Sequence, residues 1–169
     1  MGIYNLFDLR EAVALLALHY YLAYANKNTM TELLTSRLKQ FECIDFALLF
    51  GSYAMGTPNE LSDIDIAISI QREYSLLELG RVIADMEQAT GKRVDVIPVN
   101  ELHKKNPALA YEIVSTGKML FCNDAERFIT FKRNSFIHYL DVQPMLDLFR
   151  KRFTERLMSG RFAQSNYVG

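Results

Sequence analysis

The sequence has few of the residues that build metal clusters, disulfide frameworks or nucleic-acid surfaces. It contains three histidines and two cysteines, Cys43 and Cys122, with no CxxC pair or Cys/His cluster. This is typical of buried thiols in a reducing compartment. Positive charge is not in excess either, because 19 Lys and Arg residues stand against 20 Asp and Glu. Since a general nucleic-acid binder is usually clearly basic, direct nucleic-acid binding is not expected.

A long membrane-spanning run is also missing. Residues 12–25 are nearly all apolar, but they include His19 and three tyrosines. The run is shorter than the roughly 18 residues expected of a span. The segment before it carries Asp8 and Glu11 against one Arg10, which is the wrong charge for a signal peptide. We therefore expect a soluble helix in a cytoplasmic protein that has no membrane partner.

What remains is an ordinary globular composition in which strands alternate with helices. The chain has 169 residues, of which 23% are charged and half are apolar, and this fits one domain with a real core. Alternation of the two element types predicts an α/β sheet. Strands are expected at 44–50, 63–70, 93–99 and 118–121, and helices at 75–90, 107–117 and 124–160, the last broken near 141–144. The domains are expected to be a helical extension over 1–41, a core over 42–122 and C-terminal helices packed on that core over 123–169.

Three aspartates stand on two of the predicted strands. Asp63 and Asp65 share one face of their strand, and the isoleucines at 64, 66, 68 and 70 share the other. Alone, this pattern suits a half-exposed strand equally well. Asp95 has apolar neighbours on both sides, where a lone charge is costly. If the three carboxylates converge, each pair at about 4 Å costs on the order of 4 kcal/mol, so they must take up protons or hold cations.

The oxygen ligands of such a site favour Mg²⁺ or Mn²⁺ over zinc. Mg²⁺ held by two or three carboxylates usually keeps coordination sites for substrate phosphates. Gly51 and Ser52 end an apolar run ten residues before Asp63. A glycine lets the backbone approach a phosphate, and a helix beginning near Ser52 would aim free N–H groups at it. An anion site followed by a metal site indicates phosphoryl or nucleotidyl transfer.

The spacing of Gly51-Ser52, ten residues and Asp63-x-Asp65, with Asp95 on a later strand, resembles the polymerase-β nucleotidyltransferase superfamily. The segments "KRVDVIPVNEL", "NPALAYEIVSTGKMLF" and "FIHYLDVQPMLDLFRKRF" resemble the minimal nucleotidyltransferase (MNT) antitoxins that pair with HEPN-family ribonuclease toxins. The resemblance covers roughly residues 41–156. It implies a single-domain α/β (α+β) fold with a mixed sheet and flanking helices.

The resemblance also implies an activity and a set of site residues. Gly51 and Ser52 would hold the triphosphate of ATP, and Asp63 and Asp65 would bridge two Mg²⁺ ions, for which Mn²⁺ can substitute. Asp95 would ligate one metal and help to deprotonate the attacking hydroxyl. AMP would pass to a tyrosine of the HEPN toxin, with which the chain would form a hetero-oligomer.

Met55 departs from the family pattern, because many relatives carry arginine at this position. Its presence predicts weaker catalysis or a more apolar partner contact. Two other functions stay open. One is an antitoxin that masks its partner and has a silent nucleotide site, which Met55 and the apolar N-terminal helix motivate. The other is an aminoglycoside-type adenylyltransferase, for which this sequence ends earlier than an acceptor pocket would require.

Two charged segments have no assigned role in this scheme. Lys92 and Arg93 precede the strand of Asp95 and could reach a phosphate, although a solvated turn is the simpler interpretation. Residues 148–157 combine one apolar stripe with one basic face. Such a helix is usually just solvated, but it also suits docking of an acidic partner.

Overall fold

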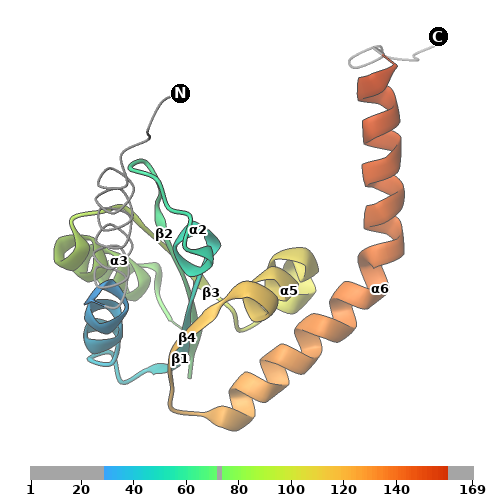
Figure 1. Cartoon of the computed structure of the whole chain (residues 1–169). Helices are drawn as coiled ribbons and strands as arrows, with labels where there is room; N and C mark the ends of the chain where they lie inside the picture. The colour runs from blue at the N-terminus through green and yellow to red at the C-terminus, as the bar shows by residue number, and fades with distance from the viewer. Residues whose placement is uncertain (1–28, 72–73, 160–169) are drawn as a thin grey trace, which may run out of the picture.

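The computed structural model describes residues 29–71 and 74–159 (Figure 1). The helix expected within 12–25 lies outside the described residues. Residues 29–38 are helical. The elements that follow are β1 (Ile44–Phe50), α2 (Gly51–Met55), β2 (Ile64–Ile70), α3 (Leu76–Thr90), β3 (Val94–Pro98), α4 (Leu102–Lys105), α5 (Pro107–Thr116), β4 (Lys118–Cys122) and α6 (Ala125–Met158). In the part of the chain so described, no helix is both long and apolar enough to cross a membrane.

The strands form one mixed sheet in the order β3-β2-β1-β4. β1 pairs antiparallel with both β2 and β4, whereas β2 pairs parallel with β3. Each of the four predicted strands is present within one residue of its expected bounds, and the expected mixed sheet with flanking helices is confirmed.

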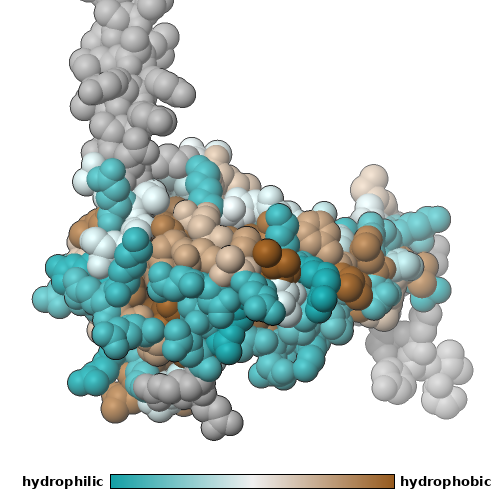
Figure 2. All heavy atoms as spheres, turned by 90° about the horizontal axis from the view of Figure 1, so that it is seen from below, coloured by the Kyte–Doolittle hydropathy of each residue, from teal (hydrophilic) through white to brown (hydrophobic). Residues whose placement is uncertain are grey.

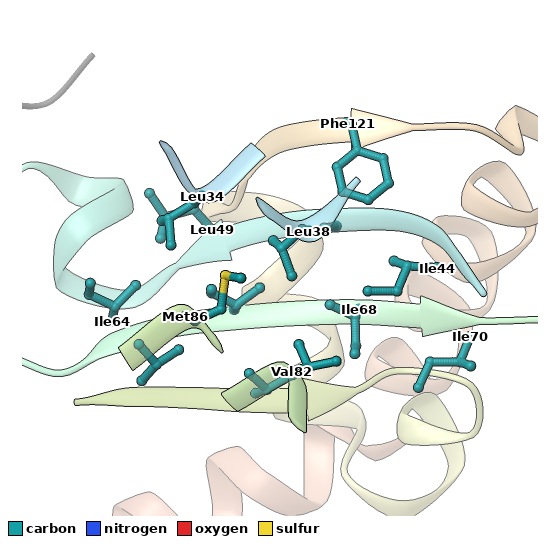
Figure 3. Close-up of a cluster of buried hydrophobic side chains, with 14 of the residues drawn as sticks. Leu34, Leu38, Ile44, Leu49, Ile64, Ile68, Ile70, Val82, Met86 and Phe121 are labelled. Carbon is teal, nitrogen blue, oxygen red and sulfur yellow. The ribbon is translucent and has the colours of Figure 1, made fainter. Parts of the chain in front are cut away.

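Both faces of the sheet are covered. On one face, Leu34 and Leu38 from the first described helix and Val82 and Met86 from α3 pack over the isoleucines of β2 (Figure 3). On the other face, side chains of β1 and β2 pack against α5 and the start of α6. The strands contribute Phe46, Leu48, Phe50 and Ala67, and the helices contribute Ile113 and Phe131. β2 is therefore buried along its length except at Asp65. The alternative of a half-exposed strand is wrong.

The two ends of α3 follow the predicted signals. Ser75 and Glu78 form a reciprocal capping box, in which each side chain accepts a hydrogen bond from the other residue's backbone N–H. At the other end, Gly91 adopts a left-handed conformation with φ of 66° and donates to the carbonyl of Glu87. The chain then passes through residues 92 and 93 into β3, so the end of α3 determines where these two residues lie.

The C-terminal region is one helix rather than several. α6 runs for 34 residues with Pro144 inside it, so the break expected near 141–144 is wrong. A proline removes one intrahelical hydrogen bond and pushes against the preceding turn, which bends a helix without necessarily ending it. Figure 1 shows α6 changing direction about midway.

Only the first part of α6 packs on the core. Phe131 and Ser135 are buried, whereas Met145, Leu148 and Phe149 in the second part are exposed. The C-terminal helices predicted to pack on the core are thus replaced by one helix that extends beyond it (Figure 1). The domain boundaries after residues 41 and 122 stay predictions. Seen from below in Figure 2, hydrophilic residues surround a band of hydrophobic ones.

Candidate active site

The predicted site residues meet at one end of the sheet. The parallel register of β2 and β3 pairs Asp65 with Asp95. The antiparallel register of β1 and β2 places Phe50 opposite Asp65, so Gly51, the next residue, lies against the same carboxylate. Asp63 lies immediately before β2. The fold therefore brings together residues that are more than forty positions apart in the sequence.

Gly51 is the point at which β1 turns into α2. Its φ is +65°, a conformation that L side chains rarely adopt. A Cβ atom here would overlap Oδ2 of Asp65 and lie 3.0 Å from its Cγ. The backbone of the turn thus runs directly against the carboxylate, which only glycine permits. Ser52 follows in the first turn of α2, and its carbonyl accepts the N–H groups of Gly56 and Thr57.

Negative charge accumulates around Asp65. Its pKa is raised above the ordinary value, first because the carboxylate is partly buried, and then because Asp95, Asp63 and Glu112 lie near it. Asp65 consequently keeps its proton to a higher pH than an isolated aspartate does.

Glu112 was not predicted from the sequence. It lies on α5, which packs against β1 and α2, and its charge reaches Asp65. One signal could have pointed to it, because Glu112 is the sole charged residue of the segment from Pro107 to Thr116. That signal does not tell which strand the helix covers. The proximity of Glu112 to Asp65 therefore follows only from the tertiary packing of α5.

Two cations from the turn before β3 contact the site. Nε of Arg93 lies 3.8 Å from Oδ2 of Asp63, and Nζ of Lys92 lies 5.9 Å from the centre of the Tyr53 ring in α2. Arg93 is exposed, as in a solvated turn, whereas Lys92 is half-buried, and the two charges contact Asp63 and α2. Met55, at the end of α2, is 60% exposed and adds no charge.

The donor chemistry of the site suits a hard divalent cation. Carboxylate oxygens are the ligands that Mg²⁺ prefers, and the carboxylates of Asp63, Asp95 and Glu112 lie near that of Asp65. Within residues 29–71 and 74–159, however, no three Asp, Glu, His or Cys side chains are gathered closely enough to hold an ion. The side chains of Asp63 and Asp95 are at least partly exposed, so rotation about their χ angles can bring their oxygens closer to Asp65.

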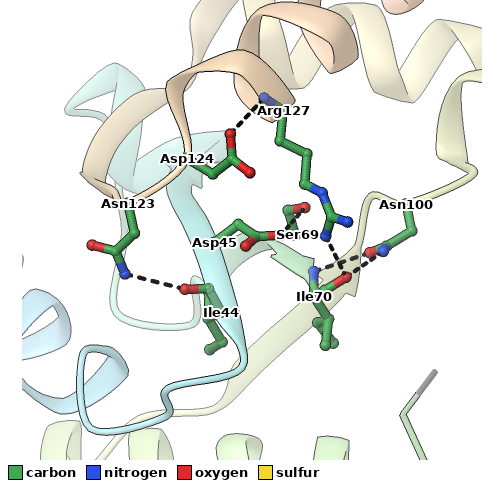
Figure 4. Close-up of polar contacts among 8 residues, drawn as sticks. All are labelled: Ile44, Asp45, Ser69, Ile70, Asn100, Asn123, Asp124 and Arg127. Atoms are coloured by element: carbon green, nitrogen blue, oxygen red, sulfur yellow. Dashed lines mark hydrogen bonds and ion pairs between the residues drawn. The ribbon is translucent and has the colours of Figure 1, made fainter. Parts of the chain in front are cut away.

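The opposite end of the sheet carries a structural network instead (Figure 4). Asp45 on β1 is 2% exposed and accepts a hydrogen bond from the guanidinium of Arg127 on α6. The same guanidinium donates to the carbonyl of Ile70, at 3.2 Å, and the Asn100 side chain bonds both backbone groups of Ile70. These contacts attach α6 and the segment after β3 to the central strands.

Comparison with known proteins gives a family for this arrangement. A family model described as "Polymerase beta, Nucleotidyltransferase" matches residues 32–126, which is more than half of the chain. Among curated relatives, protein MJ0435 of Methanocaldococcus jannaschii is 44% identical over 57 residues, covering 34% of this chain and 61% of that protein. The protein adenylyltransferase MntA of Shewanella oneidensis is 28% identical over 96 residues, covering 57% of this chain and 65% of that protein. The chain thus spans about three fifths to two thirds of the length of these two relatives.

Solved structures share the fold. A toxin-antitoxin crystal structure with AMP-PNP matches with a TM-score of 0.57 at 22% identity, over 79% of this chain and 98% of the other. A tri-AMPylated Shewanella oneidensis HEPN toxin in complex with MNT antitoxin matches with a TM-score of 0.53 at 20% identity, over 80% of this chain and 98% of the other. At these identities the likeness establishes the architecture, and the chemistry has to be argued from the site.

Proposed function

The chain belongs to the polymerase beta nucleotidyltransferase family, and from that premise we propose that it transfers AMP from ATP to a hydroxyl group of a partner protein. The observation that carries the proposal is the convergence of Gly51, Asp65 and Asp95 at one end of the sheet. A glycine turn lets the backbone approach an anion, and the neighbouring carboxylates can hold metal ions. Together they suit metal-assisted phosphate chemistry.

Each residue has a role in the proposed reaction. Asp63, Asp65 and Asp95 would hold two Mg²⁺ ions, which supply charge stabilisation to the entering and leaving oxygens of an in-line attack at the α-phosphate. Gly51 and Ser52 would let the triphosphate lie against the backbone. Asp95 would accept the proton of the attacking hydroxyl, and pyrophosphate would leave as the new phosphoester bond forms.

The proposed acceptor is a tyrosine of a HEPN-type toxin. MntA, a relative, is named as a protein adenylyltransferase, and one structural neighbour is the MNT antitoxin in complex with a tri-AMPylated HEPN toxin. The second part of α6 supports docking of such a protein, since it exposes an apolar stripe beside basic residues. The exposed apolar residues are Met145, Leu148, Phe149, Phe153 and Leu157. A cytoplasmic setting suits the proposal, because it supplies ATP and keeps Cys43 and Cys122 as free thiols.

The proposal is tested by weighing the partner. A purified HEPN-type protein from the same organism is incubated with this chain, ATP and Mg²⁺, and its intact mass is measured. The partner should gain one or more AMP units with the wild type and none with Asp63→Ala/Asp65→Ala. Glu101→Ala/Glu126→Ala serves as the control, because it removes two exposed carboxylates outside the site. No adduct with the wild type, or the same adduct with the aspartate variant, contradicts the proposal.

A second candidate function is masking, in which binding alone neutralises the partner. The exposed stripe of α6 favours it, since a docking surface works without chemistry. Cells that express the toxin together with Asp63→Ala/Asp65→Ala separate the two functions. Survival of these cells means that masking suffices, whereas loss of protection with binding retained means that transfer is required.

A further inference from the structure

The turn that leads from α3 into β3 holds two cations beside the candidate site. Its backbone is fixed at both sides of Lys92 and Arg93. Gly91 closes α3, and the carbonyl of Arg93 accepts a 3.0 Å hydrogen bond from the N–H of Ile64. The turn is therefore attached to the first residue of β2, next to Asp63, and it presents both side chains at this end of the sheet.

The two cations contact different parts of the site. Arg93 reaches Asp63, the partly exposed residue immediately before β2, with 3.8 Å between Nε and Oδ2. Lys92 lies over the ring of Tyr53, 5.9 Å from its centre, in the helix that begins at Gly51. Asp65 lies deeper, against Gly51. The two cations thus contact Asp63 and α2, the two parts of the chain that flank Asp65.

The Arg93–Asp63 pair is suited to exchange. The side chains are 81% and 42% exposed, and an exposed pair at this distance contributes little to stability. A divalent cation at Asp63 would compete for the same carboxylate oxygens and release the guanidinium. Arginine binds phosphate through two parallel hydrogen bonds, which are stronger than a long contact to a solvated carboxylate.

We propose that Arg93, with Lys92 beside it, binds the β- and γ-phosphates of the nucleotide after giving up its contact with Asp63. The inference rests on the proposed function, because it assigns residues to the nucleotide of that same site. The two side chains would also hold the pyrophosphate that the reaction releases. They would supply positive charge to a site to which Met55, at the position where many relatives carry arginine, adds none.

Binding calorimetry with three probes tests this assignment in the full chain with Mg²⁺ present. Arg93→Gln should weaken binding of AMP-PNP and of pyrophosphate about tenfold, the loss expected for a hydrogen bond between charged groups. Binding of AMP, which lacks the outer phosphates, should change little, and Lys92→Gln should show a smaller loss of the same kind. Arg93→Lys should fall between wild type and Arg93→Gln. Arg37→Gln is the matched control, since it removes a surface pair with Asp85 of similar length, 3.7 Å.

A second measurement separates phosphate binding from simple support of Asp63. Mn²⁺ binding without nucleotide, followed by electron paramagnetic resonance, should be unchanged or tighter in Arg93→Gln, because a competing cation has been removed. Weaker Mn²⁺ binding, or unchanged binding of AMP-PNP and pyrophosphate, overturns the assignment. If the wild type itself does not bind AMP-PNP, the proposed function fails as well. Urea unfolding of each variant checks that the fold is intact.

Discussion

Gly51 and Asp65 depend on each other at the scale of single atoms. The carboxylate occupies the space that a Cβ at position 51 would need, so the turn and the acid are compatible only as a pair. This part of the site could be predicted from the sequence because both residues lie in one short motif. The proximity of Glu112 to Asp65 and the contact between Arg93 and Asp63 could not be predicted, because they depend on how α5 and the α3–β3 turn pack.

Replacing Gly51 by alanine should damage both stability and transfer. The positive φ costs about 1 kcal/mol for an L residue, and the new methyl group would also displace the Asp65 carboxylate. Urea unfolding and the adenylyl-transfer assay measure the two effects.

Two other glycines serve as controls. Gly91→Ala has the same positive φ with nothing within 4 Å, so it should cost about 1 kcal/mol in stability. Gly80→Ala, in the interior of α3 with open space around it, should instead stabilise by about 0.5–1 kcal/mol. Equal changes in the free energy of unfolding and in transfer for all three variants would contradict this account of Gly51.

Asp65→Asn should stabilise the metal-free protein near neutral pH. The raised pKa of Asp65 means that its charged form is disfavoured in the folded state. That cost is present above the raised pKa and disappears below the ordinary value of 3.8. The gain should be small, because solvent screens the charge of a carboxylate that is only partly buried. Urea midpoints in EDTA between about pH 4 and pH 7.5 should therefore converge at the acid end. A difference that is constant with pH would show that charge is not the cause.

At the scale of elements, the strands were predictable and the course of α6 was not. Strand β1 agrees with its predicted bounds because an apolar run ends at a glycine turn, and β2 because apolar and polar residues alternate. Pro144 suggested a break, but a helix interior tolerates proline when the bend leaves the flanking turns intact. The second part of α6 extends beyond the core. Its sequence pattern, one apolar stripe beside a basic face, was the only sign in the sequence that this part could dock another protein.

Phe149 on this part of α6 provides a test of docking. Phe149→Glu should weaken binding of the HEPN-type partner at least about tenfold, because a buried interface core does not tolerate an unpaired charge. The stability of the chain should hardly change, since the side chain is 59% exposed. Ile129→Glu is the matched control on the same helix, with an apolar side chain that is 63% exposed. Calorimetric titration of the partner into each variant measures the effect. Docking elsewhere would be indicated if Phe149→Glu bound like the wild type.

At the scale of the whole molecule, the candidate site and a structural polar network lie at opposite ends of the sheet. The carboxylates and the glycine turn lie at one end, and the Asp45–Arg127 network lies at the other (Figure 4). The network could not be predicted, because Asp45 and Arg127 are 82 residues apart. A lone charge in the apolar strand of Asp45 indicates that a partner is needed but not which one. Stability and transfer should accordingly respond to different substitutions.

Arg127→Met should destabilise the fold and leave nucleotide binding intact. Removing the guanidinium leaves Asp45 buried without its cation, at a cost of about 3 kcal/mol in the free energy of unfolding. Asp45→Asn combined with Arg127→Met should recover most of that loss, since no buried charge is then left unpaired. Urea unfolding measures the cost, and AMP-PNP binding checks the site. Failure of the double variant to recover would mean that the pair acts through packing alone.

The central claim is attack on the α-phosphate, and isotope labelling tests it most directly. ATP labelled at the α-phosphate and ATP labelled at the γ-phosphate are incubated in parallel with the chain, Mg²⁺ and the HEPN-type partner. We predict that the α label becomes covalently attached to the partner and that the γ label appears only in free pyrophosphate. Transfer of the γ label to protein, or no transfer of the α label, would contradict the account.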